Sequence, residues 1–219
     1  MKSYGEYCPI AMGAEAIGDR WTPLVLRELI CGSERFSDIH RGVPRMSRTL
    51  LSQRLRQLER LQIVDRVEGG GYRLSDAGYD LGQVIWDLGN WAMEWLLGDP
   101  DKEHYDGSHL MWRVRQRVNE SALPPHRIVV QFDLRGAHRG RRTWLLLDPQ
   151  GSTVCERDEG FDVDLWVDTD IREFLRIWMG RSTWQQATQD GTLVLHGPGE
   201  LVRAFPDWFD LSPFAHRDS

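Results

Sequence analysis

The most regular hydrophobic pattern in the chain runs from residue 48 to residue 62. Leu51, Leu55 and Leu58 fall within one narrow stripe when residues are placed at the spacing of an α-helix. The opposite side of this helix would carry uncharged polar and basic side chains, namely Thr49, Gln53, Arg56 and Arg60. The pattern predicts an amphipathic helix from Arg48 to about Gln62, with Ser47 as its N-cap.

Shorter helical patterns precede this element. Residues 10–30 have apolar side chains at helical spacing, interrupted at Gly18-Asp19 and at Pro23, which indicates two short helices. Residues 36–41 fit one or two further turns, and Pro44 prevents that helix from continuing. We therefore expect three short helices and a turn before the amphipathic helix.

An alternating pattern follows the amphipathic helix. Residues 64–68 alternate as a strand, residues 69–71 are three glycines that form a turn, and residues 72–74 return as a second strand. Ser75 and Asp76 then open a long helix that runs to about Leu97. Its apolar side chains are Leu81, Ile85, Leu88 and Ala92 along one side, together with Trp86, Trp91 and Trp95.

This order of elements is typical of a winged helix-turn-helix. Such a domain places one rigid helix in the major groove of DNA, where each base pair presents a distinct pattern of donors and acceptors. The formal net charge of the chain is −6, yet residues 33–66 contain eight arginines against four acidic residues. One basic segment in an acidic chain indicates a local DNA contact rather than general coating of nucleic acid.

The expected DNA contacts lie on the turn, the amphipathic helix and the hairpin. From the turn and the helix they are Arg45, Ser47, Arg48, Thr49, Ser52, Gln53 and Arg56. Arg66 and Arg73 of the hairpin would reach phosphates at most. The alternative is that this polar face is only solvated, and Arg54 and Arg60 could equally pair with Glu59.

Several short runs in the first 97 residues carry a family resemblance. They are Cys8-Pro9-Ile10, residues 17–21 (IGDRW), 24–29 (LVLREL), 36–39 (FSDI), 46–47 (MS), 50–55 (LLSQRL) and 72–78 (YRLSDAG). These runs closely resemble the HxlR family of bacterial regulators, although the hairpin here is shorter. The resemblance implies a homodimer held by the N-terminal helices and the long helix, with two recognition helices on a near-palindromic site.

The pattern changes after residues 98–101 (GDPD), an acidic turn that we take as a domain boundary. Residues 128–134, 143–147, 153–157 and 163–167 read as strands, and helices are expected at 170–179, 183–190 and 199–204. The predicted fold class is therefore α+β. A winged helix-turn-helix occupies residues 1–98, and a second α+β domain occupies residues 99–219.

The second domain also carries a resemblance. Its motifs are residues 164–170 (DLWVDTD) before a helix, 179–181 (MGR), Ala187, 190–197 (DGTLVLHG) and 201–205 (LVRAF). They resemble the sterol carrier protein type 2 fold, a curved sheet with helices over an apolar tunnel. The resemblance implies binding of an apolar small molecule or lipid, lined by Trp112, Trp144, Trp166, Trp178, Trp184 and Trp208. The alternative is that these tryptophans fill a core.

Other classes of protein find little support in the sequence. The histidines lack metal-ligand spacing, no G-x-S-x-G run occurs, and residues 197–199 (GPG) are too short for a phosphate loop, so we expect no enzyme, metal or cofactor. Neither a membrane span nor a signal peptide is present, and the three cysteines suggest no disulfide framework. We expect a cytoplasmic protein that does not bind a membrane.

Two functional alternatives to a ligand-modulated regulator stay open at this point. Cys8 matches a position at which some members of the family sense oxidants or electrophiles, so the protein could be a redox-sensing regulator. Ordinary packing of that thiol is the competing interpretation. The other alternative is a lipid carrier in which the winged helix serves as an interaction module.

Overall fold

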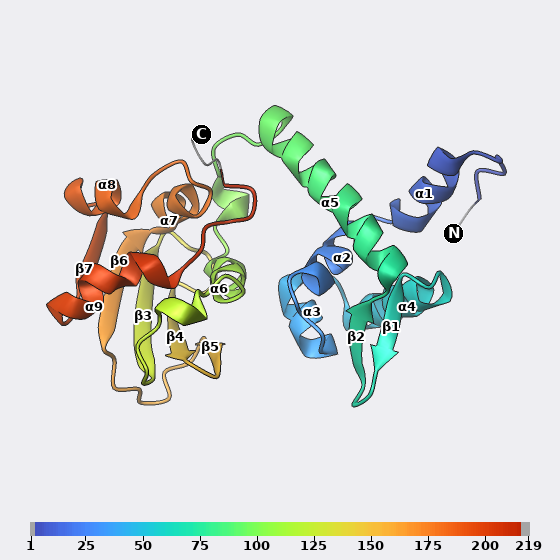
Figure 1. Ribbon diagram of the computed structural model, residues 1–219. Coiled ribbons are helices and arrows are strands. Elements are labelled where there is room, and N and C mark those ends of the chain that lie inside the picture. The colour runs from blue at the N-terminus through green and yellow to red at the C-terminus, as the bar shows by residue number, and fades with distance from the viewer. Residues whose placement is uncertain (1–2, 216–219) are drawn as a thin grey trace. The chain divides into compact units, whose positions relative to one another are not determined.

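The computed structural model describes residues 3–215 and divides the chain into two compact units, residues 1–96 and residues 97–219 (Figure 1). The division falls two residues before Gly98, where the acidic turn begins in the sequence. Each unit has its own cluster of buried apolar side chains. The N-terminal unit is mainly helical and the C-terminal unit is an α+β fold.

The N-terminal unit has the predicted winged helix-turn-helix order. Its elements are α1 (Pro9–Ile17), α2 (Thr22–Ile30), α3 (Phe36–Gly42), α4 (Arg48–Arg60), β1 (Val64–Val67), β2 (Gly71–Leu74) and α5 (Asp76–Trp95). The strands β1 and β2 pair antiparallel to form the hairpin wing. Leu51, Leu55 and Leu58 are completely buried, which confirms the apolar stripe of the amphipathic helix.

Local capping fixes where α4 and α5 begin. The Ser47 hydroxyl accepts a hydrogen bond from the backbone amide of Leu50 at 3.2 Å, and Ser75 accepts one from Gly78 at 3.1 Å. Ser75 also donates to the carbonyl of Gln62 at 2.6 Å. The same serine therefore ties the start of α5 to the segment that follows α4.

The C-terminal unit is built on one five-stranded sheet. Its elements are η1 (Lys102–His104), α6 (Gly107–Arg115), η2 (Glu120–Ala122), β3 (Ile128–Arg135), β4 (Arg142–Asp148), β5 (Gly151–Cys155), β6 (Leu165–Asp170), α7 (Ile171–Trp178), α8 (Trp184–Gln189), β7 (Leu193–His196), α9 (Gly199–Ala204) and η3 (Phe205–Trp208). The strand order is β5-β4-β3-β6-β7. β3 and β6 run parallel, and every other pair in this sheet is antiparallel.

One face of this sheet forms the core of the unit. Phe132 of β3 and Val167 of β6 are paired across the sheet and completely or almost completely buried. Helices α6 and α7 pack on that face with side chains such as Met111 and Phe174. Because a strand directs alternate residues to opposite faces, the other face carries Gln131 and Trp166, which are also paired.

Besides the short 3-10 helices η1, η2 and η3, one α-helix and one strand of this unit were not predicted from the sequence. α6 has no clear apolar stripe in the sequence, because Leu110, Met111, Trp112 and Val114 are all buried. β7 has only four residues, and its pairing with β6 supplies the hydrogen bonds that define it. Both elements depend on the tertiary structure around them rather than on a local pattern.

Candidate nucleic-acid interface

The polar face of α4 is open to solvent. Arg48, Thr49, Gln53, Arg56 and Arg60 are exposed along it, and Ser52 is half-buried beside them. The leucine stripe on the opposite side fixes the direction in which these side chains point, since it is packed into the core of the unit. α4 therefore presents one continuous polar and basic surface.

A hollow lies along the C-terminal half of this surface, lined by Gln53, Arg56, Glu59 and Arg60. Within residues 3–215, neither Arg56 nor Arg60 takes part in an ion pair with a carboxylate of the protein. The same holds for Arg48 at the other end of the helix. These guanidinium groups are available to phosphates or to base edges.

Arg54 has a different role from its neighbours on α4. Its side chain is only 11% exposed, and it forms a hydrogen-bonded ion pair with Asp19 and a hydrogen bond with Gln57. Asp19 lies in the turn between α1 and α2. Arg54 therefore holds α4 to that turn, and its partner Asp19 was not among the partners expected from the sequence.

The arginines of the wing are paired with carboxylates. The Nε atom of Arg66 donates to Glu59 at 2.6 Å, and Nη2 donates to the Tyr72 hydroxyl at 3.1 Å. The Arg66 guanidinium also lies 5.1 Å from the centre of the Tyr72 ring. The hydrogen bond that Arg66 donates to the Glu59 carboxylate raises the pKa of Arg66, which stays positively charged. The Nε atom of Arg73 lies 3.7 Å from Oδ2 of Asp65.

These contacts connect the wing with the end of α4. Glu59 lies on α4 and Arg66 on β1, so their ion pair sets the position of the hairpin relative to α4. To contact a phosphate of DNA, the Arg66 guanidinium would have to divide its hydrogen bonds between the phosphate and Glu59, or exchange Glu59 for the phosphate. Whether Arg66 and Arg73 contact DNA stays a prediction, as do the contacts expected from the exposed residues Arg45 and Ser47.

A buried ion pair positions α3, the helix before the turn. Glu28 is completely buried and accepts hydrogen bonds from Nε and Nη2 of Arg27 at 3.0 and 2.8 Å. Arg27 Nη2 also donates to the carbonyl of Gly42, the last residue of α3, at 3.0 Å. His40 Nε2 lies 2.9 Å from the carbonyl of Met46, across the turn that leads to α4.

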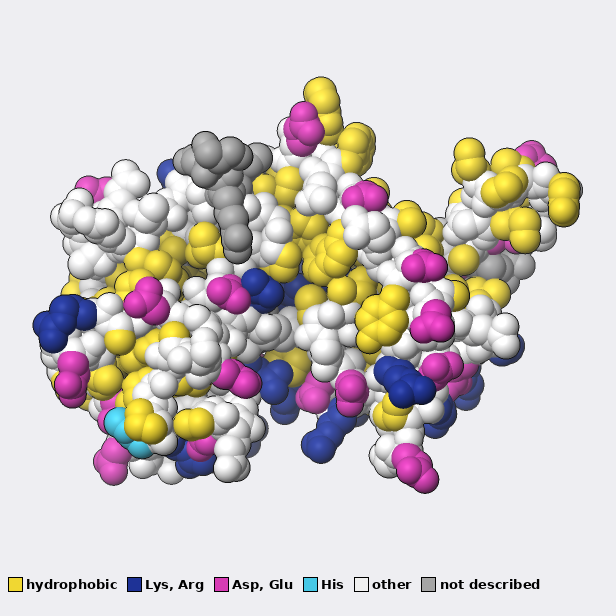
Figure 2. All heavy atoms as spheres, viewed as in Figure 1, with side chains coloured by type: hydrophobic (Ala, Val, Ile, Leu, Met, Phe, Trp, Pro, Cys, Tyr) yellow, Lys and Arg dark blue, Asp and Glu magenta, His cyan; other side chains and the backbone are white. Residues whose placement is uncertain are grey.

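Large apolar side chains remain exposed on α1 and α5. On the segment that includes α1 they are Tyr4, Tyr7, Ile10 and Met12, and on α5 they are Tyr79, Val84, Leu88, Trp91 and Trp95. Figure 2 shows hydrophobic side chains gathered over the α1 segment. Exposed apolar surface of this kind marks a site of association in a folded protein. We call these residues the α1/α5 apolar surface.

The tryptophans expected to line a ligand tunnel lie in several places within the C-terminal unit. Trp112, Trp144, Trp178 and Trp208 are buried, whereas Trp166 is 41% exposed on the outer face of the sheet. The Trp184 ring packs against the rings of Phe174, Phe205 and Phe209, with centroids 5.2 to 6.4 Å apart. Lining of an apolar tunnel by these residues stays a prediction.

Among residues 3–215, no helix combines the length and the apolar character that crossing a membrane requires. Within the same residues, no group of three or more histidine, cysteine, aspartate or glutamate side chains is arranged to hold a metal ion.

Comparisons with known proteins agree with the geometry of the N-terminal unit. Residues 16–99 match the family described as HxlR-like helix-turn-helix. YvaP of Bacillus subtilis, named as an uncharacterized HTH-type transcriptional regulator, is 33% identical over 101 residues, which cover 42% of this chain and 91% of that protein. MT3179 of Mycobacterium tuberculosis, with the same description, is 40% identical over 113 residues, covering 46% and 70%.

A solved structure described as the UbiJ-SCP2 ubiquinone synthesis protein is also similar, with 18% identity and a TM-score of 0.32. The match covers 41% of this chain and 69% of the other. A similarity of this size leaves the role of the C-terminal unit to be inferred from its own residues.

Proposed function

Since the chain belongs to the HxlR-like helix-turn-helix family, we propose that it is a transcription regulator that binds DNA as a homodimer through α4. The observation that carries this proposal is the exposed polar face of α4, with three guanidinium groups that have no ion-pair partner within residues 3–215. A helix with this face fits the major groove.

The proposal assigns different tasks to different parts of this face. Gln53 lies near the middle of α4, where an amide can form two hydrogen bonds with an adenine edge. Arg48 lies in the first turn, where a guanidinium meets phosphates at the rim of the groove. Arg45, Ser47, Thr49, Ser52 and Arg56 complete the proposed contact surface.

The α1/α5 apolar surface supports a homodimer. A second copy of the chain would cover these side chains and would place two recognition helices on one duplex. Two half-sites read in this way lie about 34–36 Å apart, one helical turn of DNA. The operator is then expected to be near-palindromic.

Gln53→Ala and Arg48→Ala are expected to weaken DNA binding in different ways. Gln53→Ala should cost about 1–3 kcal/mol on the specific site and relax the choice of sequence, because a base contact is lost. Arg48→Ala should weaken all DNA evenly and reduce the slope of log K against log salt by about 1, because a phosphate contact is lost. Fluorescence anisotropy across a salt titration measures both effects.

A matched control is Arg203→Ala on α9, which removes an exposed arginine of the C-terminal unit. It should leave both the affinity and the salt slope unchanged. Identical behaviour of the Gln53 and Arg48 variants would contradict the division of tasks between base and phosphate contacts.

A second candidate function concerns Cys8. Its thiol is partly exposed at the N-cap of α1, beside the exposed residues Tyr7 and Ile10 of the α1/α5 apolar surface. Oxidation of this thiol would therefore alter the surface that we assign to the dimer. In this version of the proposal, oxidants rather than a bound ligand change the affinity for DNA.

Treatment with diamide distinguishes the two versions. If Cys8 is the sensor, diamide should change the affinity of the protein for DNA, and Cys8→Ser should abolish that response. Cys31→Ser and Cys155→Ser are the controls, and both should respond to diamide like the protein without substitutions. An equal response in the Cys8→Ser variant would exclude sensing through this thiol.

Binding of an apolar ligand in the C-terminal unit stays a further hypothesis within the proposed function. Its main rival is a lipid carrier in which the winged helix contacts protein instead of DNA. A complete lack of binding to any duplex at low salt would favour the carrier, because nonspecific DNA binding needs only contacts between basic side chains and phosphates.

A further inference from the structure

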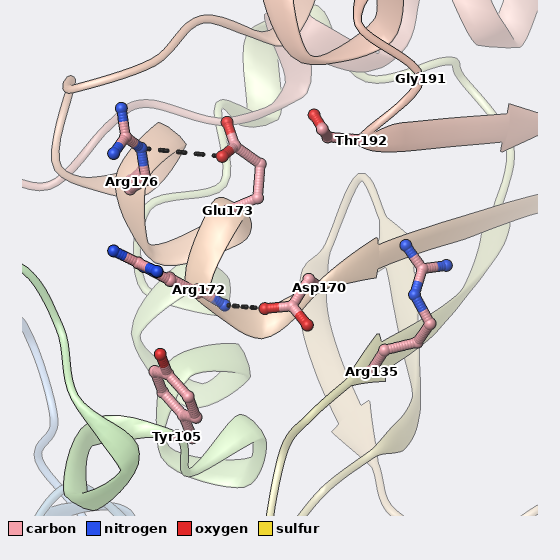
Figure 3. Close-up of a pocket in the computed structure, with 8 residues that line it drawn as sticks. All are labelled: Tyr105, Arg135, Asp170, Arg172, Glu173, Arg176, Gly191 and Thr192. Atoms are coloured by element: carbon pink, nitrogen blue, oxygen red, sulfur yellow. Dashed lines mark hydrogen bonds and ion pairs between the residues drawn. The ribbon is translucent and has the colours of Figure 1, made fainter.

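The C-terminal unit contains a polar pocket that the proposed function does not use. Figure 3 shows its lining side chains, which come from four separate parts of the sequence: Tyr105, Arg135, Asp170, Arg172, Glu173, Arg176, Gly191 and Thr192. Three of these side chains are guanidinium groups and two are carboxylates. The pocket thus has an excess of positive charge within a unit whose residues 98–219 hold 15 basic and 20 acidic groups.

The pocket lies at a special point of the sheet. Arg135 and Asp170 are paired at the carboxyl ends of the two parallel strands, β3 and β6. From there the chain leaves β3 toward β4 on one side, and leaves β6 through α7 and α8 toward β7 on the other. In open sheets, ligands bind where neighbouring parallel strands diverge in this way, since the connections leave a crevice between them.

Two guanidinium groups of this pocket have hydrogen-bond donors to spare. Arg172 and Arg176 are one turn apart on α7 and therefore share a face of that helix. Both guanidinium groups have only long ion-pair contacts. Arg172 Nη2 lies 3.5 Å from Oδ2 of Asp99, and Arg176 Nε lies 3.7 Å from Oε2 of Glu173. Within the described chain neither guanidinium donates a hydrogen bond. The Nε atom of Arg176 is buried and makes no hydrogen bond, since Oε2 of Glu173 lies 3.7 Å away.

A buried donor without a hydrogen bond is unfavourable, and more so when the group is charged, so its persistence points to a missing acceptor. Guanidinium groups form paired hydrogen bonds with planar carboxylates and with phosphates. Figure 3 shows the Tyr105 hydroxyl pointing toward Arg172, which adds a polar group at the same end of the pocket.

The other charged groups of the pocket are already engaged, and Glu173 among them lies 3.7 Å from Arg176 Nε. Arg135 forms an ion pair with Asp168, and Asp170 caps α7 by accepting a hydrogen bond from the backbone amide of Arg172 at 2.9 Å. These groups fix the walls of the pocket. Arg172 and Arg176 are left as the groups that can bind a ligand.

We propose that this pocket binds the oxyanion group of a ligand, a carboxylate or a phosphate, through the guanidinium groups of Arg172 and Arg176. The oxyanion belongs either to a free small molecule or to the headgroup of a lipid. This assignment does not depend on DNA binding by the N-terminal unit. It gives the C-terminal unit a polar binding site in addition to any apolar one.

The test uses the full chain with Arg56→Gln and Arg60→Gln, so that the basic face of α4 does not contribute anion binding. Inorganic phosphate, citrate and phosphatidylglycerol vesicles are titrated at constant ionic strength, and binding is measured by calorimetry. Adding Arg172→Gln and Arg176→Gln should raise the dissociation constant at least about tenfold, because charge-assisted hydrogen bonds are lost. Arg157→Gln, an exposed arginine beyond the β5 edge of the sheet, is the matched control and should change nothing.

A substitution that is expected to strengthen binding serves as a second test, because misfolding would weaken binding and not strengthen it. Asp99 lies 3.5 Å from Arg172 and competes for its guanidinium, so Asp99→Asn should lower the dissociation constant about two- to fivefold, the size of a partly exposed ion pair. Binding of phosphate or citrate supports a free small molecule, and binding of the vesicles alone supports a lipid headgroup. The proposal is overturned if none of the probes binds, or if the two α7 substitutions leave binding unchanged.

Discussion

Replacing Leu88 and Trp91 of α5 by aspartate is expected to convert the proposed dimer into a monomer and to weaken binding to the full operator by about 100-fold or more. Both side chains are about half exposed, 48% and 52%. Two buried carboxylates at the centre of an apolar interface have no partners, which makes association unfavourable. Sedimentation velocity measures the assembly, and fluorescence anisotropy measures the affinity.

The residues of α5 separate into three stripes, and this separation identifies which stripe faces a partner. Gly78, Gly82 and Ile85 are buried within the unit. A second stripe, with Val84, Leu88, Trp91 and Trp95, is apolar and exposed, whereas a third, with Asp80, Gln83, Asp87, Asn90 and Glu94, is polar and exposed. A helix that packs only against its own unit would have one buried stripe and one exposed polar stripe. The additional exposed apolar stripe of α5 therefore indicates a second partner.

The polar stripe supplies the matched control. Gln83→Asp together with Asn90→Asp adds the same two charges to the same helix, but on the side that the proposed dimer leaves in solvent. This variant should stay dimeric and bind the operator normally. If the Leu88 and Trp91 variant also stayed dimeric, the dimer would have to use another surface.

The loss of affinity follows from the number of recognition helices on the DNA. A monomer contacts one half-site, whereas a dimer adds the second contact as an intramolecular event. Binding to a single half-site should therefore be nearly equal for the monomeric variant and the original protein. A loss of half-site binding would instead indicate damage to α4 itself.

The elements of the N-terminal unit could be predicted because their causes are local. The leucine stripe of α4, the serine caps and the glycines of the wing each act within a few residues. Gly69 and Gly70 have φ values of +88°, a region in which glycine is favoured, so the turn of the wing is encoded where it occurs. The exposed and buried faces of α4 follow from the same local pattern.

Contacts between distant residues could not be predicted in this way. Arg54 pairs with Asp19, 35 residues away, whereas Glu59 was the possible partner indicated by the sequence. Glu59 pairs instead with Arg66 of the wing. Tyr105 and Thr192 line the same polar pocket of the C-terminal unit, and nothing in the local pattern around either residue predicts that.

Gly42→Ala is expected to destabilise the N-terminal unit by about 3 kcal/mol, as overpacking combines with damage to a buried ion pair. A methyl group at this position would lie 1.9 Å from Cδ and 2.0 Å from Oε2 of Glu28. The carboxylate is completely buried and is held by Arg27, so it cannot move aside without losing its hydrogen bonds. Hydrogen exchange of the α2 and α3 peptides in the full chain measures the loss.

Gly13→Ala is the matched control, because Gly13 also lies within a helix and a methyl group there would meet no atom within 4 Å. This substitution should be neutral or should stabilise the helix by up to about 1 kcal/mol, since alanine has the higher helix propensity. The comparison removes the effect of helix propensity from the Gly42 result. Equal exchange rates for Gly42→Ala and the original protein would contradict the predicted overlap.

Glu28→Ala tests the cause of the Gly42 effect through a double-mutant cycle. Glu28→Ala alone is expected to cost about 3–5 kcal/mol, because it leaves the Arg27 guanidinium without its carboxylate in a partly buried site. In that background the methyl group of Gly42→Ala has room, so the second substitution should add almost nothing. The two losses would then be strongly non-additive, as expected for groups in direct contact. Additive losses would instead place the strain of Gly42→Ala elsewhere in α3. Neither substitution changes a residue on the polar face of α4. The measured losses of stability would therefore come from the ion pair that positions α3 and not from a change in that face.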